Sequence, residues 1–208
     1  MKKSKRIKKS NSWKIKQHRD QFFKKSKTLG YRSRASFKLI ELNNKFKFIK
    51  KNSNLLDLGS SPGGWAQVVS KIITQGKILS IDTKPMKPVI NVKFINCDIF
   101  DLNTKKQIDN YFNGNLDVII SDMAADTTGN KSLDSIRTNQ LCAEAINFSS
   151  KILKKNGVFV SKLFMGEDFI SVKNLAKSVF KYVAFFKPES SRSESKETYL
   201  HCKILKTL

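Results

Sequence analysis

The chain has 208 residues, and its 40 Lys and Arg residues against 17 Asp and Glu residues give a formal net charge of +23. This length suits one α/β domain with at most a flexible extension. A hydrophobic content of 39% with 15 Phe residues excludes a wholly disordered chain, because it supplies enough apolar surface for a core. The positive excess indicates a polyanionic partner, for which nucleic acid is a commoner candidate than an anionic membrane.

The three cysteines Cys97, Cys142 and Cys202 are scattered and include no C-x-x-C pair. An odd number of scattered cysteines suits a reducing compartment, so we expect a cytoplasmic protein. No stretch approaches the roughly 18 consecutive apolar residues of a membrane span. The Lys-rich start is not followed by the apolar segment of a secretory signal. We therefore expect no association with a membrane.

The first 30 residues are rich in Lys, Ser and Asn and contain the isolated aromatic residues Trp13, Phe22 and Phe23. Residues 1–38 carry a net charge of +14, whereas the other 170 residues carry +9. Aromatic rings stack on bases while lysines neutralise phosphates. We predict a basic, partly disordered RNA-binding arm over 1–30 and one folded domain over 31–208. A merely solubilising tail is the alternative.

From Ser33 onwards, apolar residues recur at helical spacing up to Lys51, which predicts the first helix of the folded domain. Apolar runs and helical segments then alternate. Strands are predicted at Asn54–Gly59, Lys77–Asp82, Val92–Asn96, Leu116–Ser121, Val158–Phe164, Tyr182–Phe186 and Thr198–Leu205. Further helices are predicted at Trp65–Thr74, Asn103–Phe112, Leu133–Lys155 and Phe169–Val179, the third of them ended by Asn156-Gly157.

This alternation predicts an α/β fold whose seven-stranded sheet is mostly parallel, with right-handed crossovers. The last two predicted strands are joined without a full helix. They are therefore expected to form an antiparallel hairpin at one edge of the sheet.

A glycine-rich loop follows the first predicted strand, with the sequence Gly59-Ser60-Ser61-Pro62-Gly63-Gly64-Trp65. Ligands of open α/β sheets bind beyond the carboxyl ends of the strands. Glycines there permit a tight turn, and the following helix offers free N–H groups to a carboxylate or phosphate. The spacing differs from G-x-G-x-x-G, and the lack of G-K-[ST] excludes a P-loop.

Acids follow three successive predicted strands, namely Asp82, Asp98 and Asp122. A carboxylate at the end of the second strand can accept hydrogen bonds from both ribose hydroxyls of a nucleoside, and Asp98 could accept from an adenine amino group. Acids without a lysine in the glycine loop favour an adenosyl ligand that lacks phosphates. S-adenosylmethionine fits this description, and NAD remains open on these residues alone.

Lys162 lies within the otherwise apolar predicted strand VFVSKLF, where an unpaired ammonium would be costly to bury. It either extends to solvent from the strand end or is held between acids. Asp122 follows the fourth predicted strand and Glu197 precedes the last, so both are expected at the same edge of the sheet, and Lys38 lies on the first helix. Held among these groups, a neutral fraction of Lys162 could accept a proton from a hydroxyl.

The chain resembles the bacterial FtsJ/RrmJ-type ribosomal RNA large-subunit methyltransferase E family from about Ser33 to Leu205. The matching motifs are Ser36-Phe37-Lys38, Leu56–Trp65 (LDLGSSPGGW), Ser121-Asp122-Met123-Ala124, Lys162–Gly166 (KLFMG), and Ser190-Ser191-Arg192 with Lys196-Glu197-Thr198-Tyr199. The resemblance implies a Rossmann-like class I S-adenosylmethionine-dependent methyltransferase fold. It places the family's catalytic tetrad on Lys38, Asp122, Lys162 and Glu197, and its cofactor-binding residues on Gly59, Gly63, Trp65, Asp82, Asp98 and Asp122.

The same resemblance implies methylation of a uridine 2′-hydroxyl in 23S rRNA, in the A-loop of the large subunit, with Lys162 as general base. We expect a monomer, and no metal, because His18 and His201 lie far apart without a cluster of ligands. The chain departs from the family pattern at Ala125-Asp126, where Pro-Asn is common. Two alternatives stay open: a non-catalytic RNA-binding or ribosome-assembly factor with the same fold, and a 2′-O-methyltransferase of tRNA or mRNA caps.

Overall fold

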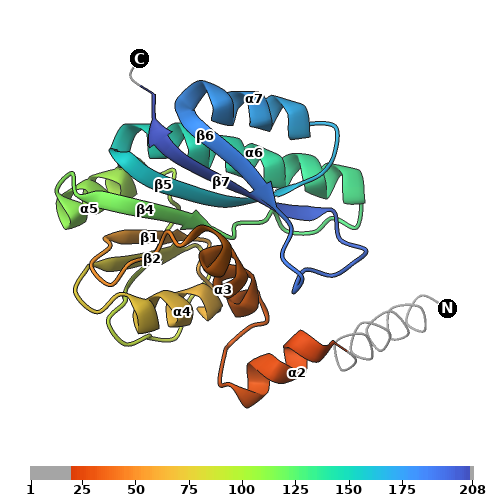
Figure 1. Cartoon of the computed structure of the whole chain (residues 1–208), viewed down its shortest axis with the longest axis horizontal. Helices are drawn as coiled ribbons and strands as arrows, with labels where there is room; N and C mark the ends of the chain where they lie inside the picture. The colour runs from red at the N-terminus through yellow and green to blue at the C-terminus, as the bar shows by residue number, and fades with distance from the viewer. Residues whose placement is uncertain (1–19, 207–208) are drawn as a thin grey trace.

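The computed structural model describes residues 20–206, which form a twisted sheet covered by helices on both faces (Figure 1). The strands are β1 Leu55–Leu58, β2 Ile78–Asp82, β3 Lys93–Asn96, β4 Leu116–Ser121, β5 Leu153–Phe164, β6 Phe180–Phe186 and β7 Glu197–Leu205. The helices are α2 Gln21–Thr28, α3 Ala35–Phe46, α4 Gly64–Ile72, α5 Leu102–Phe112, α6 Lys131–Ile152 and α7 Phe169–Val179.

The seven strands follow the order β3-β2-β1-β4-β5-β7-β6. Strands β1 to β5 pair in parallel, whereas β7 is antiparallel to both β5 and β6. The predicted mostly parallel α/β fold with an antiparallel hairpin at one edge is thereby confirmed. Within this hairpin the later strand lies inside, so β6 forms the edge and β7 contacts β5.

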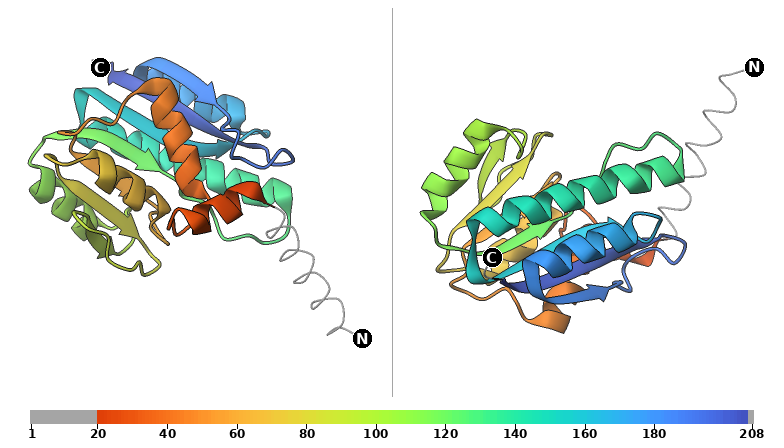
Figure 2. Two further views of the ribbon diagram at one scale, coloured as in Figure 1. Left: turned by 60° about the horizontal axis from the view of Figure 1, so that its bottom comes forward. Right: turned by 90° about the horizontal axis from the view of Figure 1, so that it is seen from above.

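Two apolar cores lie on opposite faces of the sheet. Helices α5, α6 and α7 cover one core, and α6 and α7 run side by side over it (Figure 2, right). Helices α3 and α4 cover the other core, with Leu39, Leu42 and Trp65 packed on the sheet. The central strand β1 is buried along its whole length, as expected of a strand covered on both faces.

The predicted stop of the long helix at Asn156-Gly157 is wrong. Helix α6 ends at Ile152, and the next residue, Leu153, already begins β5 and pairs with Leu116 of β4. Sheet pairing outweighs the local helical pattern here, since strand neighbours gain hydrogen bonds and burial that a longer helix would forgo. The first predicted helix is also shorter than expected, because Lys47 adopts a left-handed conformation (φ 52°) and ends α3.

A helix, α2, occupies the second part of the segment that we predicted as a partly disordered arm. Asp20 caps it by accepting hydrogen bonds from the backbone N–H groups of Phe22 and Phe23 at 3.1 Å. The Phe22 ring lies 5.5 Å from that of Phe37 on α3, which docks α2 against the folded domain. The prediction for residues 1–19, including Trp13, falls outside the described residues.

Asp20 also connects α2 to two arginines from other segments. Its carboxylate forms an ion pair with Arg34, and its Oδ2 lies 3.8 Å from Nε of Arg192 in the loop before β7. The Arg34 guanidinium donates to the backbone oxygen of Ser190 in the same loop. One carboxylate therefore joins α2, the residue that precedes α3 and the loop that leads to Glu197.

Candidate active site

A cavity of about 400 Å³ opens at the carboxyl ends of β1, β2 and β4. Four of the residues expected to bind the cofactor line it: Gly59, Asp82, Asp98 and Asp122. This is the edge at which parallel α/β sheets bind ligands. The glycine loop and the strand-end acids thus meet at one site, as the sequence predicted.

Gly59 ends β1 at a point where no side chain fits. Its φ is +71°, and a Cβ atom would lie 2.9 Å from the backbone N and Cα of Met123. The backbone N–H of Asp122 donates to the oxygen of Leu58 at 3.1 Å. The glycine therefore lets the segment after β4 close against the segment after β1, which narrows the cavity beside Asp122.

Backbone amides fix the orientation of the two acids expected to contact a nucleoside. Asp82 accepts from the N–H of Ser61 at 2.8 Å and from that of Lys84 at 2.7 Å. Asp98 accepts from the N–H of Phe100 at 2.9 Å. Carboxylate oxygens have further lone pairs, so both acids can still accept from ribose or amino groups.

The cavity is richer in acids than in bases. Asp126, at the point of departure from the family pattern, also lines it and pairs with Lys84 at 2.8 Å. Against four carboxylates, Lys84 is the single cation that lines the cavity within residues 20–206. This charge suits a ligand with a cationic sulfonium and no phosphate better than a dinucleotide with a pyrophosphate. The residues present therefore fit S-adenosylmethionine.

Gly63 and Trp65 do not line this cavity. Gly63 (φ +107°) precedes α4, and a Cβ atom there would lie 2.5 Å from Nη1 of Arg32. Trp65 is 2% exposed, and its Nε1–H donates to the backbone oxygen of Ala35 at 2.8 Å. The structure gives both residues a packing role between the glycine loop and the residues around α3.

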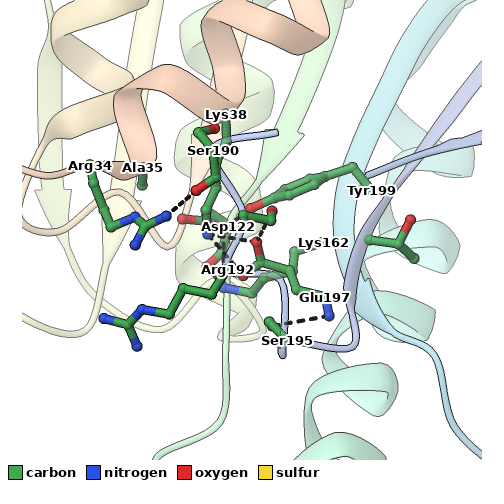
Figure 3. A network of polar contacts seen from close by, with 12 residues as sticks. Arg34, Ala35, Lys38, Asp122, Lys162, Ser190, Arg192, Ser195, Glu197 and Tyr199 are labelled. Atoms are coloured by element: carbon green, nitrogen blue, oxygen red, sulfur yellow. Dashed lines mark hydrogen bonds and ion pairs between the residues drawn. The ribbon is translucent and has the colours of Figure 1, made fainter. Parts of the chain in front are cut away.

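The four predicted catalytic residues come together as two ion pairs (Figure 3). Lys162 Nζ lies 3.0 Å from Asp122 Oδ1 and donates to the Asp122 backbone oxygen at 2.6 Å. Lys38 Nζ lies 2.7 Å from Glu197 Oε1. Strand register explains the Lys162–Asp122 pair. Ser121 of β4 lies opposite Ser161 of β5, and Asp122 and Lys162 are the residues that directly follow them.

Burial decides between the two interpretations of Lys162. Its side chain is only 8% exposed, so it does not extend to solvent. Burial alone would raise the pKa of Asp122, but the charges of Lys162 and Lys38, with a hydrogen bond from Tyr199, hold that pKa below its ordinary value. Asp122 is therefore an anion at neutral pH and binds the Lys162 amine.

Sequence reasoning missed Tyr199 as a member of this cluster. Its hydroxyl donates to Asp122 Oδ1 at 2.8 Å, and its ring is fully buried against Trp65. Burial, followed by the negative charges of Asp122 and Glu197, raises the pKa of Tyr199 well above its ordinary value, so the hydroxyl keeps its proton. The signal was present, because residues two apart on a strand share a face and Tyr199 follows Glu197 at that spacing.

Ser191, in the motif Ser190-Ser191-Arg192, contacts one of the four predicted catalytic residues. Its hydroxyl donates to Glu197 Oε1 at 2.8 Å, on the same carboxylate that binds Lys38. The loop before β7, whose Ser190 N–H donates to Glu41 of α3, therefore helps to orient Glu197 together with Lys38.

Asp57, inside β1, is a second buried acid that the sequence reasoning passed over. It is fully buried, accepts from the Ser80 hydroxyl at 3.1 Å, and its Oδ1 has no partner in the described part of the chain. Burial, only partly offset by the Ser80 hydrogen bond, raises the pKa of Asp57 to about 7. An acid within an apolar strand was the available signal.

A second, larger cleft of about 820 Å³ adjoins the first site. Lys38 and Glu197 line this cleft, whereas Asp122 lines the acidic cavity. Four further cations border the cleft: Arg34, Lys131, Arg192 and Lys196. The carboxylates of Asp134, Glu167 and Glu194 also line the cleft, so with Glu197 it holds five cations and four acids. The buried lysine–aspartate pair thus stands between an acidic cavity and a cleft of mixed charge, whose cations can contact the phosphates of an anionic acceptor.

A model of the FtsJ-like methyltransferases matches residues 31–205. The chain belongs to this family. It is 45% identical over 197 residues to the ribosomal RNA large subunit methyltransferase E of Pelagibacter ubique, a match that covers 95% of this chain and 97% of the relative.

Solved structures agree with the assignment to the FtsJ-like methyltransferases. A Plasmodium falciparum crystal structure, described as a ribosomal RNA methyltransferase, matches with a TM-score of 0.74 and 34% identity over 84% of this chain and 98% of the other. Human methyltransferase-like protein 13, in complex with SAH, shares the fold at a TM-score of 0.56 and 17% identity, over 81% and 79% of the two chains. The FtsJ-like fold and the methyltransferase class are therefore established.

Two other features of this FtsJ-like methyltransferase concern metals and membranes. Within residues 20–206 no group of three or more His, Cys, Asp and Glu side chains is placed to hold a metal ion. No helix in that range is long and apolar enough to cross a membrane. His201 instead stacks on Phe46 with ring centroids 4.0 Å apart.

Proposed function

We propose that this protein transfers the methyl group of S-adenosylmethionine to the 2′-hydroxyl of a uridine in 23S rRNA, in the A-loop of the large ribosomal subunit. The observation that carries the proposal is the buried Lys162–Asp122 pair between the acidic cavity and the cleft that Lys38 and Glu197 line. The choice of RNA rests on the name of the relative from Pelagibacter ubique and on motifs that extend over most of the chain.

The acidic cavity would hold the cofactor. Asp82 would accept hydrogen bonds from its ribose hydroxyls and Asp98 from its adenine amino group, while Asp122 would face its cationic part. When bound, S-adenosylmethionine supplies a methyl group already activated by its positive sulfonium. The protein therefore contributes mainly by positioning the acceptor and removing its proton.

Lys162 acts as the general base in this proposal. The amine takes the proton of the 2′-hydroxyl as the oxygen forms its bond to the methyl carbon, and the bond between that carbon and the sulfur breaks. Asp122 orients the amine through two contacts, to its carboxylate and to its backbone oxygen. Lys38 adds positive charge nearby, and Glu197 accepts a hydrogen bond that aligns the hydroxyl.

The basic residues account for RNA docking. Residues 1–19 contain seven Lys, two Arg and no acid, and they join the folded part next to Asp20. Asp20 contacts Arg34 and Arg192, which border the cleft. We infer that residues 1–30 bind the RNA backbone beside the cleft, so that affinity falls steeply with salt.

The Lys162→Ala variant tests the mechanism. We expect it to lose methyl transfer while S-adenosylmethionine binds with nearly unchanged affinity in calorimetry, which also shows that the variant folds. Lys181→Ala, an exposed lysine on β6, is the control and should keep full activity. Substantial turnover by Lys162→Ala would defeat the assignment of the general base.

The RNA is tested separately with labelled methyl donor and either large ribosomal subunits or tRNA. Label in 23S rRNA, mapped to a uridine 2′-oxygen, supports the proposal. Label in tRNA alone would replace the RNA assignment and leave the chemistry in place. Absence of label from every RNA, with cofactor still bound, would favour the non-catalytic RNA-binding factor.

A further inference from the structure

The 820 Å³ cleft has two chemically different walls. One wall carries the cations Arg34, Arg192 and Lys196, with Glu194 and Glu197 among them. The other wall contains an apolar cluster, Ile136 of α6 with Phe164 and Met165 at the end of β5, bordered by polar residues of segments 127–135 and 166–167. The Met165 side chain is 47% exposed, which leaves a large apolar group open to the cleft.

A polar group without a partner lies in the wall that contains the apolar cluster. The Ser135 hydroxyl on α6 is buried and has no hydrogen-bond partner among residues 20–206. Gly166 faces it, and a Cβ atom at that position would lie 3.1 Å from the hydroxyl oxygen. Buried hydroxyls are normally satisfied, because an unmade hydrogen bond is costly. The wall thus combines apolar surface with one unsatisfied group, as small-molecule sites do.

The ribose, the phosphates and the base of a bound nucleotide can each be assigned to a part of this cleft, starting from the predicted catalytic residues. Lys38 and Glu197 line the same cleft, so the methyl-accepting ribose enters beside them. The phosphates and the base leave a ribose in different directions. Phosphates match the wall that carries the cations, whereas a base, with an apolar face and a polar edge, matches the other wall.

We propose that the wall formed by Ser135, Ile136, Phe164 and Met165 binds the base of the nucleotide being methylated, after that base has left the RNA stack. This inference rests on the proposed function. The Met165 thioether packs on the face of the base, since sulfur makes favourable contacts with aromatic rings. The Ser135 hydroxyl hydrogen-bonds the polar edge, and the absent side chain of Gly166 leaves room for it. Bases on which enzymes act are commonly taken out of the stack in this way.

The test uses the full-length protein and an RNA that the wild type methylates, with 2-aminopurine placed next to the target nucleotide. Its fluorescence rises when the neighbouring base leaves the stack. Met165→Ala and Ser135→Ala are expected to raise the KM for RNA at least fivefold and to reduce the fluorescence rise. Their affinity for S-adenosylmethionine, measured by calorimetry, should stay unchanged.

Ile170→Ala is the matched control, because Ile170 is also apolar and exposed (58%) but lies on α7 outside the cleft. It should behave as the wild type in every assay. If both cleft variants match the wild type in KM and fluorescence, the base subsite is disproved while the proposed function stands. If the wild type methylates the RNA without any fluorescence rise, the base stays stacked and the inference also fails. Failure to methylate any RNA overturns both proposals.

Discussion

The hydroxyl of Tyr199 donates to Oδ1 of Asp122, the same carboxylate oxygen that binds Lys162, at 2.8 Å. Tyr199 belongs to β7 and Asp122 follows β4, so β5, which carries Lys162, lies between their strands. The lysine proposed as general base is therefore held by a carboxylate that is itself hydrogen-bonded from β7, the strand on the other side of β5.

Replacing Tyr199 with Phe should lower kcat about tenfold, because a hydrogen bond to a charged group contributes roughly 1.5 kcal/mol. The KM for RNA and the affinity for the cofactor should change little. Loss of the donor raises the pKa of Asp122 and weakens the contact that orients the Lys162 amine. An unchanged kcat would contradict this role, and thermal melting checks that packing is kept.

The Asp20→Asn variant separates the cap of α2 from its ion pairs. Asn caps helices as well as Asp does, but it cannot pair with Arg34 and Arg192. Amide hydrogen exchange in α2 and in residues 187–196 should become about fivefold faster, equivalent to ~1 kcal/mol of local stability. Asp20→Ala should lose a further ~1 kcal/mol with the cap.

Asp101→Asn is the matched control for Asp20, because Asp101 caps α5 through Asn103 and makes no ion pair with an arginine among residues 20–206. It should leave exchange in α2 unchanged. Wild-type exchange rates in Asp20→Asn would show that the ion pairs do not hold α2.

His201 should make the protein less stable in acid. Burial, assisted by the charge of Lys203, lowers the pKa of His201 to about 4 from 6.5. Between pH 6.5 and pH 4, His201 is protonated in the unfolded chain but stays neutral in the folded protein. The free energy of unfolding therefore falls as the pH drops from 6.5 to 4. In His201→Phe, which keeps the stack on Phe46, the free energy of unfolding by urea should lose about 2 kcal/mol less over this range. An identical pH dependence in the variant would refute the assignment.

Asp57 should make the folded protein more stable in acid than at neutral pH, the opposite of the effect of His201. With its pKa raised to about 7, the folded protein keeps a proton that the unfolded chain releases near pH 4. Stability contributed by the neutral acid is full below pH 4 and is lost as the pH rises to 7. Asp57→Asn should therefore lose less unfolding free energy between pH 4 and pH 7, by an amount of the order of 3 kcal/mol. Parallel urea-unfolding curves for both proteins across these pH values would contradict this.

The strands were accessible from the sequence because each is an apolar run bounded by polar or turn residues. Parallel strands bring their carboxyl ends to one edge, which made Asp122 and Lys162 candidates for one site. The proposed tetrad as a set, with Lys38 and Glu197, came from the resemblance to the family, because spacing alone does not show which distant side chains meet. The passage from α6 to β5 was not accessible, because the helical pattern continues beyond Ile152 and only pairing with β4 ends it.

Helix α2 and the position of Trp65 needed the structure as well. The α2 segment is too short and basic to predict as a stable helix, and it depends on contacts with Phe37 and Arg34 made after folding. Trp65 directly follows the glycine loop in sequence, but its ring turns away from the cavity toward Ala35 and Tyr199. The direction of a side chain at a loop-to-helix junction depends on neighbours far along the chain.

Strand β7 lies between β5 and β6 in the sheet although it is translated after both, which affects the order in which the site can form. Glu197 and Tyr199 reach Lys38 and Asp122 only when this late strand has paired with β5. A chain still on the ribosome and translated only as far as β6 already has the glycine loop and Asp122 for the cofactor cavity. It lacks Glu197, which pairs with Lys38, and Tyr199, which donates to Asp122, so the proposed catalytic cluster is completed only after β7 has been made.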